Sequence, residues 1–234
     1  MLLAKVDPAD QVPSTRTLYL SKIEFDVQSQ TVREDLSDRY KLHQRIMTMA
    51  PDGVSGEDIR LLYRVEPSSM SRTNSVGSIL IQSLVQPDAT RLPNGYRLVG
   101  TKDLAKPYST HCKAGATFRI LLVASPSKVV SNEMGFEKKK KRFIVNAEER
   151  IQWFARKAQM SGCRVLEKDG RLQVLVSPLN DVIGRKDNMR ILYRPVLFTS
   201  LITIEDEKRF LEAIEEGIGR GKAFGMGLAT IRKI

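Results

Sequence analysis

The order of apolar patterns constrains the fold of this chain most, because the order in its first half returns in its second half. In the first half, a strand expected at 17–27 precedes a helix at 36–50, two further strands and a strand at 118–124. In the second half, a short strand at 143–145 precedes a helix, several strands, a second helix at 205–216 and a closing strand. Each half approximates a β-α-β-β-α-β unit. We therefore predict an α+β fold of two tandem ferredoxin-like domains.

The first helix of each half is the clearest element. In residues 36–50, a stripe that includes Tyr40 and His43 follows the i, i+4, i+7, i+11 spacing of one helix face. In the second half, Asn146 can cap a helix that runs from Ala147, with a glutamate three residues on as a capping-box partner.

Other stretches are less regular. A shift in strand alternation near Ser21 and Lys22 suggests a bulge. Residues 86–103 hold Pro, Asn and Gly and are expected to be irregular, and the polar residues 181–188 are expected to form a mobile loop. The predicted organisation is an irregular N-terminal extension at 1–16, an N-terminal ferredoxin-like domain at 17–125, a linker and basic hairpin at 126–142, and a C-terminal ferredoxin-like domain at 143–234.

Residues 217–227 read Gly-Ile-Gly-Arg-Gly-Lys-Ala-Phe-Gly-Met-Gly. Glycine tolerates φ > 0 and lets another molecule approach the main chain. Exposed backbone N–H groups together with Arg220 and Lys222 would suit a phosphate. The segment is not a P-loop, because Glu216 and Ala223 break that pattern, and no helix follows it. The simpler alternative is a glycine-rich turn at the C-terminus of a helix.

Charge and composition narrow the class of partner. The net charge is +11, the pI is about 9.7 and 41% of the residues are hydrophobic, which favours a globular protein that binds a polyanion, nucleic acid before a membrane surface. No apolar run is long enough to cross a bilayer and no signal region opens the chain, so we expect a cytoplasmic protein without a membrane partner.

Metal chemistry has little support in the sequence. Cys112 and Cys163 are far apart and lack a C-x-x-C spacing, so they are expected to be reduced thiols. A zinc site would need nearly every Cys and His of the chain, His43 and His111 included. No carboxylate cluster resembles a two-metal nuclease site. We therefore expect neither a metal nor another cofactor.

Histidine is the side chain whose proton moves near neutral pH. His111 lies in an expected loop and is interpreted as a surface residue. His43 follows Tyr40 by three residues on the first helix, so both side chains lie on one face and can act on a single group. The alternative is a buried helix stripe that includes a hydrogen-bonded Tyr and His.

Five consecutive cations lie near the predicted domain boundary: Lys138, Lys139, Lys140, Lys141 and Arg142. Charge runs are usually solvated loops. Because this run lies between two expected strands, it is also compatible with a hairpin that reaches into a groove between the halves.

These segments resemble, in order along nearly the whole chain after Arg16, the CasE family of CRISPR repeat endoribonucleases from type I-E Cascade complexes. Residues 33–44 are similar to the catalytic helix of that family, in which an Arg-x-Asp-Leu run precedes Tyr-x-x-His. The strand at 61–67, the Ala-Ser-Pro-Ser-Lys turn at 124–128 and the closing glycine-rich loop also match. Ser125 replaces the usual Asn, and the N-terminal extension has no counterpart.

The resemblance implies a metal-independent endoribonuclease that cuts precursor CRISPR RNA at the 3′ base of the repeat stem-loop. The attacking group would be the RNA's own 2′-hydroxyl, the products a 2′,3′-cyclic phosphate and a 5′-hydroxyl, and the enzyme would stay bound to the guide RNA. Tyr40 and His43 would be catalytic, with the proton that His43 moves left open. The partners implied are the repeat stem-loop and other Cascade subunits, with no DNA specificity. The implied RNA-binding residues are Lys128, Lys138, Lys139, Lys140, Lys141, Arg142, Gly219, Arg220, Gly221 and Lys222.

Two alternatives remain open from the sequence. A non-catalytic CRISPR RNA-binding subunit of the same fold would share the charge and the glycine-rich loop but would have no use for His43. A DNA-binding protein is the more distant alternative, because the chain has no helix-turn-helix or zinc-finger signature.

Overall fold

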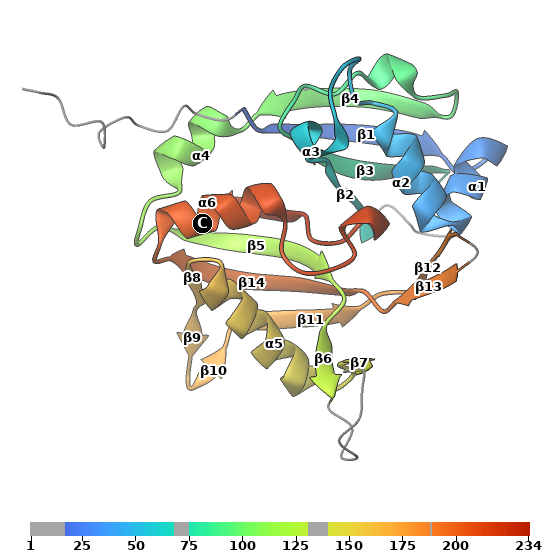
Figure 1. The fold of residues 1–234 in the computed structure, drawn as a ribbon. Helices are drawn as coiled ribbons and strands as arrows, with labels where there is room; N and C mark the ends of the chain where they lie inside the picture. Colours follow the sequence, from blue (N-terminus) through green and yellow to red (C-terminus); the bar gives the residue numbers. More distant parts are fainter. Residues whose placement is uncertain (1–16, 68–74, 131–139, 188) are drawn as a thin grey trace, which may run out of the picture.

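The computed structural model describes residues 17–67, 75–130, 140–187 and 189–234. Two sheets face each other with α6 between them (Figure 1). The elements in chain order are β1 (Tyr19–Asp26), α1 (Gln30–Ser37), α2 (Arg39–Met47), α3 (Gly56–Ile59), β2 (Leu62–Val65), β3 (Val76–Ser83), the 3₁₀ helix η3 (Ala89–Arg91), β4 (Tyr96–Asp103), α4 (Ala105–His111), β5 (Thr117–Ala124), β6 (Ser127–Val130), β7 (Lys140–Phe143), α5 (Ala147–Met160), β8 (Cys163–Val165), β9 (Glu167–Lys168), β10 (Arg171–Leu172), β11 (Val174–Pro178), β12 (Val182–Lys186), β13 (Met189–Tyr193), β14 (Val196–Ile204), α6 (Glu207–Glu216), the 3₁₀ helix η4 (Lys222–Phe224) and β15 (Ala229–Lys233).

The first sheet is antiparallel and has the order β2-β3-β1-β4. The helices α1 and α2 pack on it, because Val32 and Leu42 share one buried cluster with Ile23 and Ile79 of the strands. The helix expected at 36–50 corresponds to α2, and a separate helix that was not predicted, α1, starts earlier at Gln30 and includes the first two residues of the expected range. Asp38 separates them with an extended backbone and caps the second.

The edge strand β4 was not predicted, because it lies in a stretch whose sequence contains Pro, Asn and Gly. The expectation for residues 86–103 is wrong in its second half, where β4 pairs along β1. Nearly all of the β4 side chains are at least partly exposed, so the strand carries no apolar alternation. The register shifts where Lys22 and Ile23 face Gly100 and Leu98. The irregularity expected near Lys22 is therefore present, with the additional residue on β4.

The second sheet has the order β11-β14-β5-β15, and β8 also pairs with β14. β5 lies in its interior, between β14 and β15. The sequence pattern places this strand in an N-terminal domain at 17–125, whereas its pairing places it in the second unit. The chain therefore passes between the units at α4, before β5 rather than after it. Phe118, Ile120 and Leu122 pack in the second core with Phe154 of α5 and Phe210 of α6.

The expected helices of the second half are confirmed. The Asn146 side chain accepts a hydrogen bond from the Glu149 N–H, 3.0 Å away, and so caps α5. Glu149 does not complete a capping box, because its carboxylate pairs with Lys128 at 2.7 Å. In α6, Phe210 and Ile214 are buried.

Among the described residues, three hairpins project from the second sheet, and two of them, β6–β7 and β12–β13, concern the predicted sites. β6 pairs with β7, so the stretch predicted as a linker and basic hairpin at 126–142 is a hairpin between β5 and α5 in its described part. β12 pairs with β13, so the prediction of a mobile loop at 181–188 is wrong. In Figure 1 β6 and β7 lie at the far end of the second unit, whereas β12 and β13 reach α2 of the first.

Polar contacts lock the two units together. Arg64 of β2 is 2% exposed, and its Nη1 donates to the carbonyls of Leu121 and Leu228, each 3.3 Å away. Its Nη2 donates to Thr230 Oγ1 at 3.1 Å, and its Nε donates to Glu66 at 2.7 Å. A buried guanidinium is tolerated when its donors are satisfied in this way. These contacts hold β2 of the first unit against β5 and against the segment that follows the glycine-rich loop.

Candidate active site and RNA-binding surface

A buried carboxylate fixes the start of α2. Asp38 is 5% exposed, and its Oδ1 accepts from the N–H of Tyr40 at 3.0 Å and from the N–H of Arg185 in β12 at 3.1 Å. Gly184 makes this approach possible, because a Cβ there would lie 3.0 Å from the Tyr40 nitrogen and 2.4 Å from the Phe224 ring. One side chain therefore caps the helix and attaches it to the β12–β13 hairpin.

The structure brings Tyr40 and His43 together, as the spacing predicted. Their ring centroids are 6.2 Å apart, and the His43 ring stacks on Tyr63 at 6.3 Å. His43 is half-buried, and its Nδ1 is enclosed with no hydrogen-bond partner among the described residues. Burial lowers the pKa of His43 below its ordinary value of 6.5. The neutral imidazole is therefore favoured at neutral pH.

His43 opens onto a cleft between the two units. The other lining residues are Met47, Gly56, Arg60, Leu61, Leu62, Glu216, Lys222 and Ala223. Lys222 comes from the glycine-rich loop and is exposed. Arg60 lies 3.7 Å from Glu216 in an exposed ion pair. An imidazole beside a free ammonium and a guanidinium is suited to a phosphate that undergoes proton transfer.

The glycine-rich loop is shaped by backbone angles that favour glycine. All five glycines, Gly217, Gly219, Gly221, Gly225 and Gly227, have φ between 77° and 93°. α6 ends at the first of them, so the simpler interpretation of a helix-ending turn holds for that position alone. The rest of the loop folds back on the first unit.

Close packing on Tyr63 places the loop beside His43. A Cβ at Gly225 would lie 2.9 Å from the Tyr63 ring. The Tyr63 hydroxyl lies 3.2 Å from the carbonyl of Arg39 and 3.1 Å from that of Ala223. Tyr63 is fully buried, and burial raises its pKa well above its ordinary range. The phenol therefore remains a donor that ties the loop to α2.

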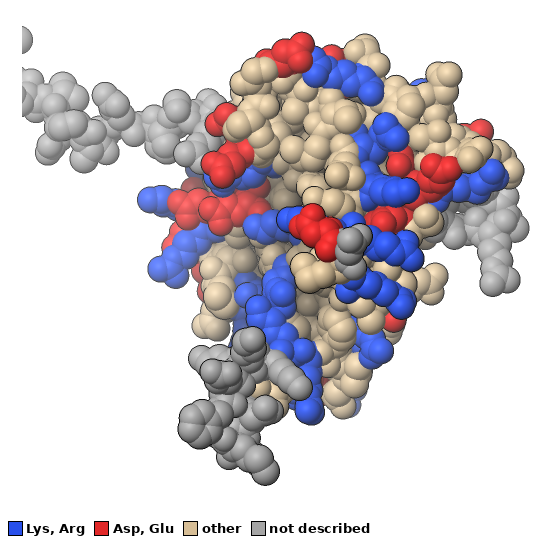
Figure 2. Space-filling model, turned by 45° about the vertical axis from the view of Figure 1, so that its right-hand side comes forward, with Lys and Arg blue, Asp and Glu red and all other residues tan. Residues whose placement is uncertain are grey.

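The predicted basic residues of the β6–β7 hairpin do not line the His43 cleft. In β6 and β7, Lys128 faces Arg142 directly, and both are exposed together with Lys141. Lys138 and Lys139 lie outside the described residues, and so does the side chain of Lys140. Figure 2 shows a band of Lys and Arg side chains over the lower half of one face, the half that holds the second unit in Figure 1. The structure therefore separates a basic surface from the His43 cleft, which Arg220 does not line either.

Sequence reasoning missed several residues of the site. Lys186 lies with its Nζ 5.9 Å from the centroid of the Tyr40 ring. Arg60, which follows α3, lines the same cleft as His43, and Tyr63 of β2 stacks on the His43 ring, although neither is close to α2 in sequence. The Leu-Leu-Tyr-Arg run that matches the resembling family was the available signal for Tyr63, whereas nothing local marked Arg60 or Lys186.

The cysteines and the second histidine lie outside the cleft. Cys112 and Cys163 are buried free thiols, and burial raises their pKa values to about 11 and about 12. His111 is exposed, as predicted, but the expectation of a loop is wrong, because His111 is the last residue of α4. In the described part of the chain, no three or more His, Cys, Asp and Glu side chains are grouped so that they could hold a metal ion. No helix within the described ranges is long and apolar enough to span a membrane.

The fold and the cleft define a class: two tandem ferredoxin-like units with a histidine-bearing helix beside a glycine-rich loop. Residues 18–233 match the family described as CRISPR associated protein, and the chain belongs to that family.

Relatives confirm the resemblance and the fold. The chain is 27% identical over 220 residues to the CRISPR-associated endoribonuclease Cse3 of Thermus thermophilus, which covers 92% of this chain and 99% of the relative. The structure of Thermus thermophilus Cse3 bound to an RNA representing a pre-cleavage complex matches with a TM-score of 0.77 and 26% identity, over 92% of this chain and 99% of that one. Cas6e from Escherichia coli K-12 shares the fold, with a TM-score of 0.67 and 22% identity over 92% and 100% of the two chains.

Proposed function

We propose that the chain is an endoribonuclease that cuts precursor CRISPR RNA in the His43 cleft. The observation that carries this proposal is the cleft itself, where a half-buried imidazole with a lowered pKa lies beside Tyr40, Lys222 and Arg60. Membership of the CRISPR-associated family supports it, and so does the relative named as an endoribonuclease whose structure contains RNA. We place the activity in the cytoplasm.

The proposed reaction is an internal transesterification without a metal ion. The 2′-oxygen of the nucleotide before the cut forms a bond to phosphorus, and the bond from phosphorus to the leaving 5′-oxygen breaks. The 2′-hydroxyl loses its proton and the 5′-oxygen gains one. The products are a 2′,3′-cyclic phosphate and a 5′-hydroxyl, and no covalent bond forms between the protein and the RNA.

His43 supplies proton transfer in this scheme. Burial favours its neutral form, which accepts a proton, so we assign it the role of general base toward the 2′-hydroxyl. Because Nδ1 is enclosed, Nε2 is the atom left to reach RNA. Tyr40 positions or donates to the same centre, and the cation of Lys222 stabilises the negative charge that develops on the phosphate oxygens.

The stem of the repeat would lie on the basic surface of the second unit. A-form RNA is held by phosphate contacts and shape, and the exposed Lys128, Lys141 and Arg142 present cations on one hairpin. Cleavage at the 3′ base of the stem leaves these contacts intact. The protein therefore stays on its product and connects the guide RNA to the other subunits of a Cascade-type complex.

Cleavage that depends on the 2′-hydroxyl of the RNA distinguishes this enzyme from a non-catalytic RNA-binding subunit. The test uses the CRISPR repeat RNA of the same genome with a single 2′-deoxy nucleotide at the cleavage position. We expect no cleavage and unchanged binding. His43→Ala should slow cleavage of the unmodified RNA by about 10²–10⁴-fold, and Tyr40→Phe by less. Cleavage of the 2′-deoxy RNA, or undiminished cleavage by His43→Ala, would sink the proposal.

A further inference from the structure

A second cavity lies on the other side of η4 from the His43 cleft. It measures about 210 Å³, several times the roughly 30 Å³ share of one water molecule. The floor is apolar and buried, with Val123 5%, Phe224 7% and Met226 1% exposed. The other lining residues are Arg39, Val65, Pro67, Leu179, Asn180, Val182, Pro195 and Gly225.

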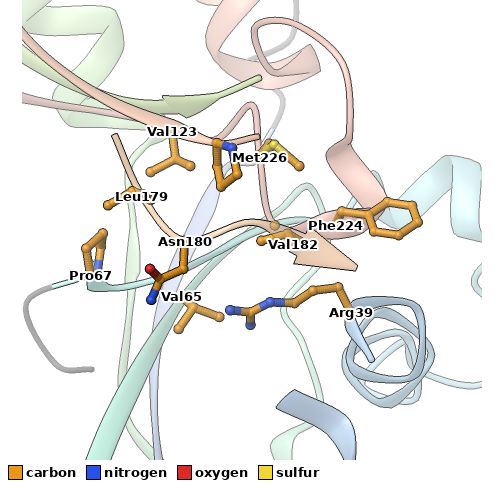
Figure 3. A pocket seen from close by; sticks show the side chains of 11 residues that line it. Arg39, Val65, Pro67, Val123, Leu179, Asn180, Val182, Phe224 and Met226 are labelled. Atoms are coloured by element: carbon orange, nitrogen blue, oxygen red, sulfur yellow. The ribbon is translucent and has the colours of Figure 1, made fainter. Parts of the chain in front are cut away.

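One charged group points into this apolar space. Figure 3 shows the side chain of Arg39 extending from α2 into the cavity, toward Val65 and Asn180. The Arg39 Nη1 is buried and has no hydrogen-bond partner among the described residues. Arg39 is the one charged side chain among the described residues that line the cavity.

The contrast with Arg64 shows what the Arg39 cavity lacks. Arg64 is buried with all three of its nitrogens donating to oxygen acceptors of the protein, whereas the Arg39 Nη1 has none. A buried guanidinium nitrogen without an acceptor is costly, so it persists where an acceptor arrives with a ligand. Arg64 is thus a structural arginine, and Arg39 is placed for a ligand.

The cavity and the reaction cleft are adjacent. Arg39 precedes His43 by four residues on one face of α2, a rise of about 6 Å along the helix. Ala223 lines the His43 cleft and the next residue, Phe224, lines the Arg39 cavity. A strand whose phosphate lies at His43 can therefore place a neighbouring nucleotide in the second cavity.

We propose that this cavity binds an unpaired nucleobase of the RNA next to the scissile phosphate, with Arg39 reading an acceptor edge of that base. The proposal rests on the RNA function proposed above. Apolar walls suit the flat face of a base, and a guanidinium donates best to the O6 and N7 acceptors of guanine. Asn180, exposed at the rim, adds an amide. A phosphate group is the poorer occupant, because it would lose its hydration and gain only one cation among apolar side chains.

Free nucleosides test the cavity independently of cleavage. Saturation-transfer NMR on the full chain, with millimolar guanosine, adenosine, cytidine, uridine or inorganic phosphate, should give the strongest binding for guanosine. His43→Ala should bind guanosine like the wild type, so a failure of the catalytic proposal would leave this result standing. Arg39→Met should lose the guanosine signal, while the control Arg33→Met, at an exposed position of α1, should keep it. Equal binding of inorganic phosphate, or no nucleoside binding, would overturn the proposal.

The repeat RNA tests the cavity in its proposed setting. In the His43→Ala background, an abasic substitution at one unpaired position beside the cut should weaken binding by about 5- to 150-fold. Arg39→Met should weaken binding of intact RNA by a similar factor. It should weaken binding of the abasic RNA little further, because the two changes remove the same interaction. Independent, additive losses would contradict the assignment.

A stability measurement separates a ligand-binding arginine from a structural one. Because the Arg39 Nη1 lacks a partner among the described residues, Arg39→Met, which replaces the guanidinium by a shorter and neutral side chain, should be at least as thermally stable as the wild type. A lower Tm would show that Arg39 supports the fold and that the cavity is not a binding site.

Discussion

His43 is the residue on which the proposed chemistry depends, and its surroundings predict a pH profile. Burial lowers its pKa below 6.5, so the neutral base persists to a lower pH than in water. The rate of single-turnover cleavage at subsaturating enzyme should therefore rise with pH and reach half of its plateau below pH 6.5. Tyr40→Phe should keep this midpoint. A rate that falls as pH rises through this range would instead assign His43 as the general acid.

The candidate site could be predicted from sequence only where residues are local. Tyr40 and His43 follow from one helix face and from the family resemblance. Arg60 and Lys222 join them through tertiary packing, and the loop that carries Lys222 is held in place by Tyr63 of β2. Arg39 carried no signal at all, because an arginine at the start of a helix is ordinarily solvated.

At the scale of elements, the glycine-rich loop is the part most sensitive to substitution. Gly225→Ala places a Cβ at φ 80°, 2.9 Å from the Tyr63 ring. The left-handed backbone costs about 1–2 kcal/mol for a residue with a Cβ, and overpacking adds about 1–3 kcal/mol. Gly225→Ala should therefore lower the free energy of unfolding by the sum of both.

Gly115→Ala is the matched control, because Gly115 has φ 82° and open space around its Cβ position. Gly115→Ala should lower the free energy of unfolding only by the cost of the left-handed backbone. Chemical denaturation of both variants measures the difference. Equal losses would mean that the loop does not pack on Tyr63 as described.

The elements themselves show how far sequence patterns extend. α5 and α6 were predictable because caps and apolar spacing are local signals. β4 was not, because an exposed edge strand lacks alternation. β5 was recognised as a strand, but its sheet was not, since a buried alternating run fits either core and only pairing with β14 and β15 decides. Asp38 split the first helix, although the apolar face continues across it.

At the scale of the whole molecule, the charge is divided between a reaction cleft and a basic surface. The double variant Lys141→Gln/Arg142→Gln should weaken binding of the repeat hairpin and flatten its salt dependence. Each phosphate contact contributes about 0.7–0.9 to the log–log slope, so the slope should fall by about 1.4–1.8 if both residues contact phosphates.

A charge-matched control isolates the position of these residues. Lys102→Gln/Arg33→Gln removes the same charge from exposed sites of the first unit and should leave the slope unchanged. Binding titrations at four or more salt concentrations measure the slope for both double variants. Identical slopes would show that the β6–β7 hairpin is solvated and does not contact RNA.

The central claim concerns the products, and mass spectrometry of the cleaved repeat RNA tests it most directly. The RNA of the same genome is incubated with the full chain in excess EDTA, and the masses of both fragments are measured. We expect undiminished cleavage, a 2′,3′-cyclic phosphate on the upstream fragment and a 5′-hydroxyl on the downstream one. A 3′-hydroxyl and a 5′-phosphate, or activity that EDTA abolishes and magnesium restores, would contradict it.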